Sequence, residues 1–198
     1  MVDMRHLKEL LLQSLEHERA GVDVYAAAIR CAVSQDLKHQ WSEYLEQTQT
    51  HVDILENVLR KLEMDPEQLT SGRRIVRSLG NALVMAMETA KATGDPASAQ
   101  LVACECIVLA ETKDHMNWEL LTKGAARLEG AQKQALEEAC EIVEEQEDEH
   151  LYHSRGYWRE LWLDALGLPA MLPPPEEMQH VRSAISAAQA QQQSERNR

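Results

Sequence analysis

Carboxylate and imidazole side chains stand in the middle of several amphipathic segments, on faces that are otherwise apolar. The sharpest pattern is Glu147-x-x-His150, because residues three apart on a helix project from one face and can bind the same metal ion. Glu18, His51 and Glu111 occupy the apolar faces of three other segments. Burying such groups is costly unless they pair with one another or bind a metal. We therefore predict that these five residues form a metal site.

Two further residues, His115 and Glu144, extend this set of predicted ligands. His115 lies one helical turn beyond Glu111, and Glu144 lies one turn before Glu147. A ligand set of carboxylates with a minority of imidazoles suits iron or manganese better than copper(I) or a zinc–thiolate site. The combined set predicts iron or manganese in the core, either as one ion or as two.

The same residues also fit a metal-free interpretation. Glu18 can be a core acid that forms an ion pair with His51 or His150, and His115 can be a hydrogen-bond partner of Glu111. In that case the polar core is structural. The other histidines that lie off the inner faces are expected to be solvated: His6, His17, His39 and His180.

The elements that carry these residues are predicted to be helices. Phe is absent, and apolar residues recur at spacings of three and four, as they do in amphipathic helices. Long helices are predicted over about residues 3–34, 36–63, 95–124 and 131–166. Asp3 and Asp95, the latter followed by Pro96, are the predicted N-caps. An intermediate helix is predicted to end near residue 93, with an inner face of Ile75, Val76, Leu79, Leu83 and Met87.

Composition sets the broad class of protein. The chain has 33 acidic and 20 basic residues, a formal net charge of −13 and no basic stripe, which argues against a nucleic-acid partner. Its apolar runs are far shorter than the roughly 18 residues that cross a membrane, and its N-terminus lacks the pattern of a secretory signal. We expect a cytoplasmic protein without a membrane partner, whose cysteines are reduced core thiols. A bundle over residues 1–168 is predicted to precede a tail over 169–198, with a proline elbow and a short C-terminal helix.

The inner-face residues resemble the ligands of the ferritin-like superfamily, the bundle shared by ferritins, rubrerythrins and manganese catalases. Di-iron and di-manganese members use a Glu from each of two helices and a Glu-x-x-His from each of the other two. Glu18 matches the first-helix ligand, Glu111 matches the third-helix ligand, and Glu147 with His150 matches the fourth-helix motif. The resemblance implies an all-α, ferritin-like, up-down four-helix bundle with an additional crossover helix.

The second helix departs from this family pattern. Residues 44–58 look most like the second helix of bacterial ferritin-like stress proteins of unassigned activity. However, Thr48 stands where the Glu-x-x-His that ends in His51 would have its glutamate. Because one bridging carboxylate is missing, both a mononuclear and a dinuclear site remain open.

The resemblance also carries expectations about activity and assembly. It implies oxygen, peroxide or Fe(II) as substrates, and a di-iron or di-manganese oxidoreductase if the protein is an enzyme, with no catalytic residue assigned. It implies a homodimer or a larger homo-oligomer, for which Trp158 and Trp162 are candidate contact residues. The alternative is a non-catalytic stress or scaffold protein with an ion-paired core, which acts through oligomerisation or through partner binding by its tail.

Overall fold

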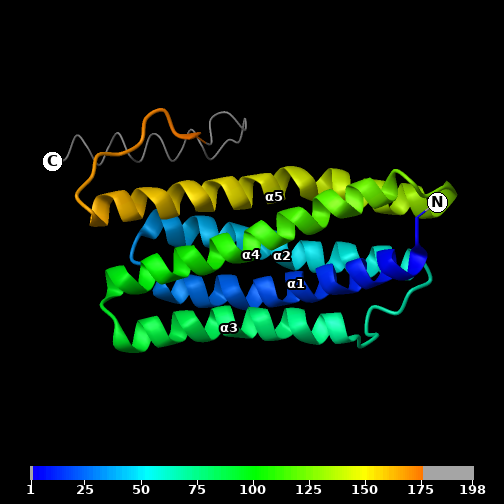
Figure 1. Cartoon of the computed structure of the whole chain (residues 1–198), viewed down its shortest axis with the longest axis horizontal. Coiled ribbons are helices and arrows are strands. Elements are labelled where there is room, and N and C mark those ends of the chain that lie inside the picture. The colour runs from blue at the N-terminus through cyan, green and yellow to red at the C-terminus, as the bar shows by residue number, and fades with distance from the viewer. Residues whose placement is uncertain (1, 176–198) are drawn as a thin grey trace.

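The computed structural model describes residues 2–175 and is built from helices (Figure 1). In chain order these are α1 (Met4–Cys31), α2 (Gln35–Lys61), α3 (Ser71–Thr93), α4 (Pro96–Ala125) and α5 (Gly130–Ala165). No strand occurs within residues 2–175, so the all-α prediction is confirmed. The predicted short C-terminal helix lies outside the described residues.

Side-chain caps fix where the helices begin. The carboxylate of Asp3 accepts a hydrogen bond from the backbone N–H of Arg5, which confirms the predicted cap of α1. Asp95 accepts from the backbone of Ala97 and Ser98, and Pro96 occupies the first helical position of α4, where its missing N–H costs nothing. A cap of this kind stabilises a helix by about 1 kcal/mol.

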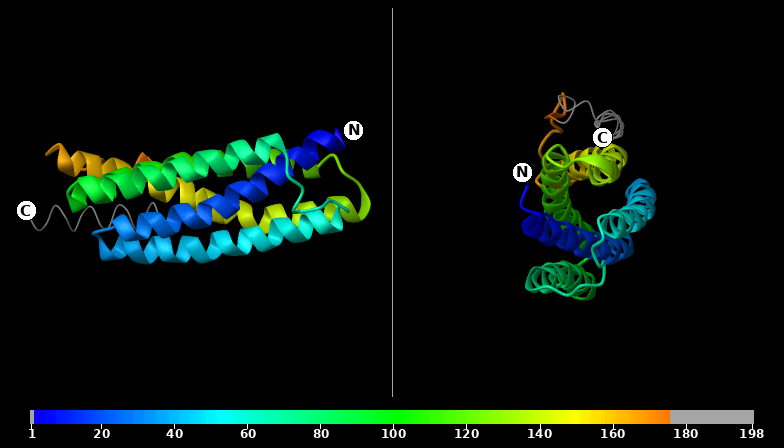
Figure 2. Two further views of the ribbon diagram at one scale, coloured as in Figure 1. Left: turned by 90° about the horizontal axis from the view of Figure 1, so that it is seen from below. Right: turned by 90° about the vertical axis from the view of Figure 1, so that its right-hand side faces the viewer.

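Four of the helices enclose a common core, and the fifth packs outside it. α1 contacts α2 and α4, and α5 contacts the same two helices, so that these four form a closed ring (Figure 2). α3 packs against α1 and α4 and returns the chain to the end at which α2 began (Figure 1). Within residues 2–175 no helix is long and apolar enough to span a membrane.

The apolar core is divided into two clusters along the bundle. One cluster contains Leu11, Leu55 and Leu136, and the other contains Trp41 and Ile107 near the opposite end. The cysteines Cys31, Cys104, Cys106 and Cys140 are free and buried, as expected of core thiols. The polar residues of the predicted site lie between the two apolar clusters, because each helix carries them near its middle.

The face that α3 turns to the bundle differs from the predicted one. Val76 and Met87 are buried as expected, but Ile75 and Leu79 are 62% and 54% exposed. Gly80 is buried instead, and a Cβ atom there would lie 2.5 Å from the Cβ of Ala20 on α1. The close approach of the two helices at this glycine sets the rotation of α3 and leaves part of its apolar stripe outside.

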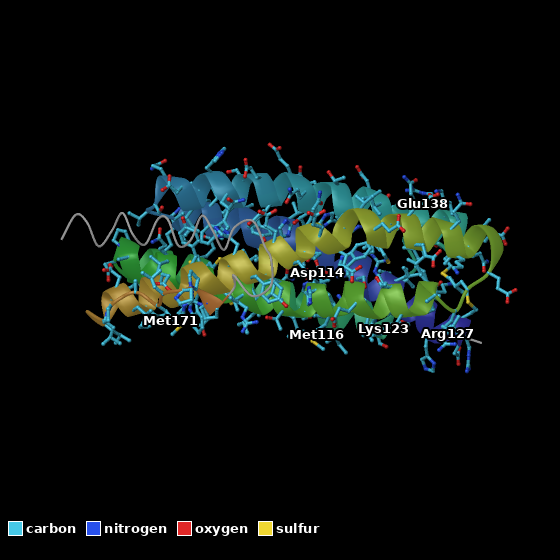
Figure 3. All side chains as sticks on the ribbon, turned by 90° about the horizontal axis from the view of Figure 1, so that it is seen from above. Asp114, Met116, Lys123, Arg127, Glu138 and Met171 are labelled. Atoms are coloured by element: carbon cyan, nitrogen blue, oxygen red, sulfur yellow. The ribbon has the colours of Figure 1, made fainter. Side chains whose placement is uncertain are left out.

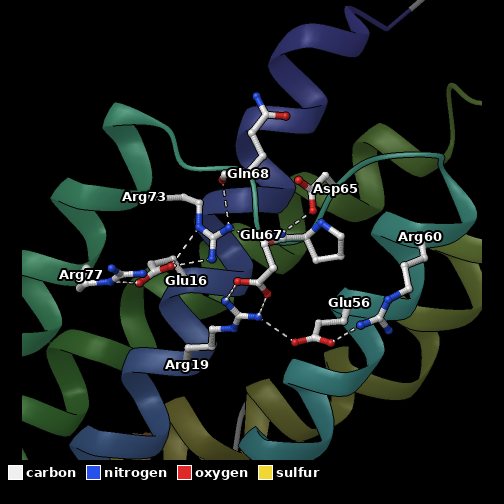
Figure 4. A network of polar contacts seen from close by, with 10 residues as sticks. Glu16, Arg19, Glu56, Arg60, Asp65, Glu67, Gln68, Arg73 and Arg77 are labelled. Atoms are coloured by element: carbon white, nitrogen blue, oxygen red, sulfur yellow. Dashed lines mark hydrogen bonds and ion pairs between the residues drawn. The ribbon is translucent and has the colours of Figure 1, made fainter.

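Ion pairs hold α3 and the preceding loop against α1 (Figure 4). Buried Arg73 donates to the Glu16 carboxylate from Nε at 2.9 Å and from Nη2 at 2.8 Å, and Arg77 binds the other oxygen. Burial alone would raise the pKa of Glu16, but the hydrogen bonds from Arg77 and Arg73 outweigh it and lower that pKa. Arg19 on α1 joins Glu56 on α2 to Glu67 in the loop. The network ties α3 to the two helices that carry one half of the candidate site.

Candidate metal centre

Five predicted ligands converge between the two apolar clusters. Glu18 comes from α1, His51 from α2, Glu111 from α4, and Glu147 with His150 from α5; all five are buried. Their side chains form two groups, Glu18–His51–Glu147 and Glu111–Glu147–His150, in each of which the potential ligand atoms lie within 4.8 Å of one another. Glu147 belongs to both groups, so its carboxylate stands between two adjoining positions for a cation.

Both imidazoles turn Nδ1 toward the carboxylates. His51 Nδ1 lies 3.1 Å from Glu147 Oε1 and 3.5 Å from Glu18 Oε1. His150 Nδ1 lies 3.5 Å from the same oxygen of Glu147 and 3.6 Å from Glu111 Oε2. One carboxylate oxygen is therefore close to both rings.

The atoms that face the centre have no hydrogen-bond partner among the described residues. They are Glu18 Oε2, Glu111 Oε2, both oxygens of Glu147, and Nδ1 of His51 and His150. A buried polar atom left without a partner costs about 1–3 kcal/mol, so a cluster of them calls for an explanation. Lone pairs on carboxylate oxygens and on imidazole nitrogens are metal ligands, and a cation between them would satisfy the whole cluster. The residues present thus fit a metal.

The outward-facing atoms of the centre do have partners. His51 Nε2 lies 2.7 Å from Oε1 of Gln146, and His150 Nε2 lies 2.6 Å from Oε1 of Gln47. The indole Nε1 of Trp118 donates to Glu18 Oε1 at 2.9 Å. The hydrogen bonding of the site therefore lies outside the centre.

Opposing charges shift the pKa values of the five residues. Burial raises the pKa of Glu18 and Glu111. Burial alone would also raise the pKa of Glu147, but the imidazoles of His150 and His51, whose Nδ1 atoms lie within 3.5 Å of its Oε1, outweigh burial and lower that pKa to about 2. Burial opposes a charge on the imidazoles, yet the carboxylates prevail and raise the pKa of His51 to about 11 and of His150 to about 9. Without a metal, protonated His51 and His150 thus stand beside ionised Glu147 at neutral pH, as two imidazolium–carboxylate pairs that share one carboxylate.

Tyrosines close the side of the centre near His150. The ring centroid of Tyr44 lies 4.2 Å from that of His150, and the ring of Tyr25 lies 6.0 Å from it. Both tyrosines are buried, and burial raises the pKa of each hydroxyl, so both stay protonated. His153 packs edge-on against Tyr44, and burial lowers its pKa to about 4, which keeps it neutral. These neutral rings exclude water from one side of the centre.

A fourth buried acid near the centre, Asp114, was not predicted from the sequence. It lies on the buried side of α4, one turn beyond Glu111, whereas neighbouring Met116 and Lys123 lie on the exposed side (Figure 3). Burial raises the pKa of Asp114 far above its usual value, and the nearby carboxylates of Glu18 and Glu147 raise it further. The spacing of three residues from Glu111 is the sequence signal that could have identified it.

Thr48 occupies the position at which the second helix was predicted to lack a glutamate. It is buried and packs against Gly21 of α1, where a Cβ atom would lie 3.2 Å from Thr48 Cγ2. Thr48 therefore fills the place that corresponds to Glu147 in the other half, and Gly21 the place that corresponds to Asp114.

The remaining predicted ligands lie away from the two groups. His115 is half-buried, with Nδ1 3.2 Å from Asp148 and Nε2 3.9 Å from Glu119. Glu144 is also half-buried, and within residues 2–175 neither it nor His115 belongs to a group that could hold a metal. The structure therefore brings together five of the seven predicted ligands.

The prediction that His17 is solvated is wrong. Its side chain is buried between α1 and α4, and its Nε2 lies 3.0 Å from the carbonyl oxygen of Ala110. Burial lowers the pKa of His17 to about 4, so the ring is neutral and donates to that carbonyl. His6 and His39 are exposed as expected, and His180 lies outside the described residues.

Comparisons of the chain with models of protein families, with curated proteins and with solved structures gave no match. Function is therefore inferred from the chemistry of the centre itself.

Proposed function

We propose that this protein binds iron or manganese in its core, at two adjoining positions that share Glu147. Glu18 and His51 hold one position, and Glu111 and His150 hold the other. The observation that carries the proposal is the cluster of inward-facing oxygen and nitrogen atoms without hydrogen bonds among the described residues. Three carboxylates and two imidazoles form a hard ligand set that suits Fe(II) and Mn(II).

The order of the helices supports a ferritin-like bundle. α1, α2, α4 and α5 supply the ligands, and α3 acts as the crossover helix that brings α4 back to the starting end of α2 (Figure 1). Glu147-x-x-His150 on α5, with single glutamates on α1 and α4, supplies three of the four contributions of a carboxylate-bridged dinuclear site. The fourth contribution is incomplete, because Thr48 stands where the second helix would carry its glutamate.

The chemistry follows from the metal and from the residues around it. Two such ions would supply redox chemistry toward oxygen, peroxide or Fe(II), as in a di-iron or di-manganese oxidoreductase. Tyr25 and Tyr44 keep bulk water from the His150 side. With Thr48 in place of a carboxylate, three negative ligands face two divalent ions, which leaves the centre with one more positive charge than negative. This excess of positive charge favours the binding of a small anion and disfavours higher oxidation states of the metal.

A second candidate function is that of a non-catalytic helical protein with an ion-paired core. The close approach of His51 Nδ1 to Glu147, at 3.1 Å, and the raised pKa values of His51 and His150 favour it, because imidazolium groups can neutralise the buried carboxylates without a metal. In this case function resides in oligomerisation or in partner binding, including by the tail over residues 169–198. In either case we propose a homodimer or larger oligomer; Trp162, which is 42% exposed on α5, is a candidate contact residue.

Metal content per chain distinguishes the two candidates. The protein is purified without chelators, loaded anaerobically with Fe(II) or Mn(II), and measured by inductively coupled plasma mass spectrometry. We expect about two ions per chain, or about one if the site is mononuclear. His115→Ala is the matched control and should keep the metal, because His115 contacts Asp148 rather than the centre. Content well below one ion per chain, unrestored by loading, would contradict the metal proposal.

A further inference from the structure

Two glutamines connect the halves of the centre in a reciprocal arrangement. Gln47 on α2 contacts His150 on α5, with 2.6 Å between Oε1 and Nε2. Gln146 on α5 contacts His51 on α2, with 2.7 Å between the corresponding atoms. Each helix therefore carries one histidine of the centre and the outer partner of the histidine on the other helix.

The chemistry of these contacts fixes which nitrogen faces the metal. An amide oxygen only accepts a hydrogen bond, so Nε2 of each imidazole must carry the proton. The neutral ring then has its lone pair on Nδ1. In both His51 and His150 this is the atom that faces Glu147 and has no hydrogen-bond partner among the residues described. The glutamines thus select the tautomer that can bind a metal in the centre.

We propose that Gln47 and Gln146 are positioning residues of the metal centre, each of which holds from one helix the imidazole that binds metal from the other. The inference rests on the metal-binding function proposed above and assigns it two further residues. Outer hydrogen-bond partners of metal-bound histidines orient the ring and fix its tautomer. Because a glutamine is uncharged, it does so without adding negative charge to the centre. The arrangement also couples the two positions, since ordering α2 against α5 orders both imidazoles at once.

Cobalt(II) and Mn(II) are the probes for the test. In the Co(II)-loaded protein each Nδ1-bound imidazole gives an exchangeable Nε2–H proton, which the paramagnetic ion shifts outside the usual proton NMR range. His150→Ala and His51→Ala assign these two signals by removing one each. We expect Gln47→Leu to broaden or remove the His150 signal, and Gln146→Leu to act on the His51 signal.

Affinity for Mn(II) gives a second readout. Each glutamine-to-leucine change should weaken Mn(II) binding by about 10- to 100-fold, as the loss of an outer partner does elsewhere. Gln47→Leu should have little further effect in the His150→Ala background, because Gln47 contacts His150. It should keep its effect in the His51→Ala background, because the partner of His51 is Gln146. Gln49→Leu on α2 and Gln134→Leu on α5 change exposed glutamines and are the matched controls. Circular dichroism establishes that each variant folds.

The outcomes separate the inference from the function on which it rests. Wild-type protein that binds neither Co(II) nor Mn(II) would contradict the proposed function. Wild-type protein that binds both ions, with unchanged affinity and unchanged signals in the Gln47 and Gln146 variants, would overturn the positioning role alone. The same conclusion would follow if each glutamine variant altered the signal of the histidine on its own helix.

Discussion

The two halves of the centre follow the same plan but carry different numbers of buried acids. The α1–α2 half contributes Glu18 and His51, and the α4–α5 half contributes Glu111 and His150. Each histidine has a glutamine partner from the opposite half. At these levels the halves are equivalent, which indicates a pseudo-twofold relation between the two helix pairs.

The difference lies in the residues between these ligands. Glu147, three residues before His150, corresponds to Thr48, three residues before His51. Asp114, three residues after Glu111, corresponds to Gly21, three residues after Glu18. The α4–α5 half thus has two additional buried carboxyl groups where the other half has a threonine against a glycine. Among the described residues, Glu147 is therefore the carboxylate that the two groups of potential ligands share.

Glu147→Gln should have the largest effect, because it neutralises the only carboxylate that both groups share. We expect the metal content to fall from about two ions per chain to nearly none, and the Mn(II) affinity to fall by more than the roughly 100-fold that the loss of an outer partner costs. Mass spectrometry of metal content and Mn(II) titration measure both. If Glu147→Gln kept one tightly bound ion, the two positions would not depend on a common carboxylate.

Thr48→Glu should make the two halves alike. In the metal-free protein an additional buried carboxylate would lie near Glu18 and Glu147, and we expect the free energy of unfolding to fall by about 3–5 kcal/mol. With Mn(II) bound, a second bridging carboxylate would balance the two divalent ions, so Mn(II) affinity should rise. Thermal unfolding with and without Mn(II) measures both effects. Thr50→Glu, at an exposed position of α2, is the control; equal behaviour of the two variants would show that residue 48 does not face the centre.

The helices and most ligands could be predicted because they depend on local spacing. Asp3 and Asp95 cap helices with their own neighbours, and the apolar stripes place Glu18 and Glu147 on inner faces. The face of α3 could not be predicted, because a buried ion pair of Arg73 and the close approach at Gly80 override its apolar stripe.

Burial on more than one face explains the residues that sequence reasoning missed. α1 contacts α2, α3 and α4, so consecutive residues Glu16, His17 and Glu18 are all buried, and a single inner stripe does not describe the helix. Gln146 lies in an acidic run that is typical of an exposed face. Its role depends on the position of His51, 95 residues away in the chain.

Two imidazoles with raised pKa values should make metal binding and metal-free stability respond to pH in opposite directions. In the metal-free protein the pKa values of His51 and His150 rise to about 11 and about 9, above an unfolded value near 6.5. The contribution of these two histidines to the free energy of unfolding is complete below pH 6.5. The contribution of His150 is lost as pH rises through 9, and that of His51 as pH rises through 11. For His150 the loss is at most about 3 kcal/mol. Metal ligation requires the loss of a proton from each ring, so Mn(II) affinity should rise with pH.

Chemical unfolding of the metal-free protein and Mn(II) titration, each between pH 6 and pH 9, measure these two trends. His150→Ala should reduce the pH dependence of both the metal-free stability and the Mn(II) affinity. Metal-free stability that did not fall between these pH values would contradict the imidazolium–carboxylate pairs.

Asp114→Asn should have the smallest effect and tests whether the additional acid of the α4–α5 half takes part in binding. Asp114 belongs to neither group of potential ligands among the described residues, so Mn(II) affinity should change by less than about 3-fold, compared with the roughly 10- to 100-fold expected for an outer partner of a ligand. Its raised pKa means that the folded state binds a proton that the unfolded state releases above pH 3.8. Keeping that buried acid therefore costs stability increasingly as pH rises above 3.8.

Asparagine removes this cost while preserving shape, so the free energy of unfolding should increase by about 1–3 kcal/mol at pH 7, and by less at pH 5. Chemical unfolding at the two pH values measures the difference, and Asp53→Asn on the outer side of α2 is a control for the loss of one negative charge. A stabilised variant with unchanged Mn(II) affinity would confine binding to the five convergent ligands. A large loss of affinity would instead make Asp114 the α4–α5 half's replacement for the carboxylate missing at Thr48.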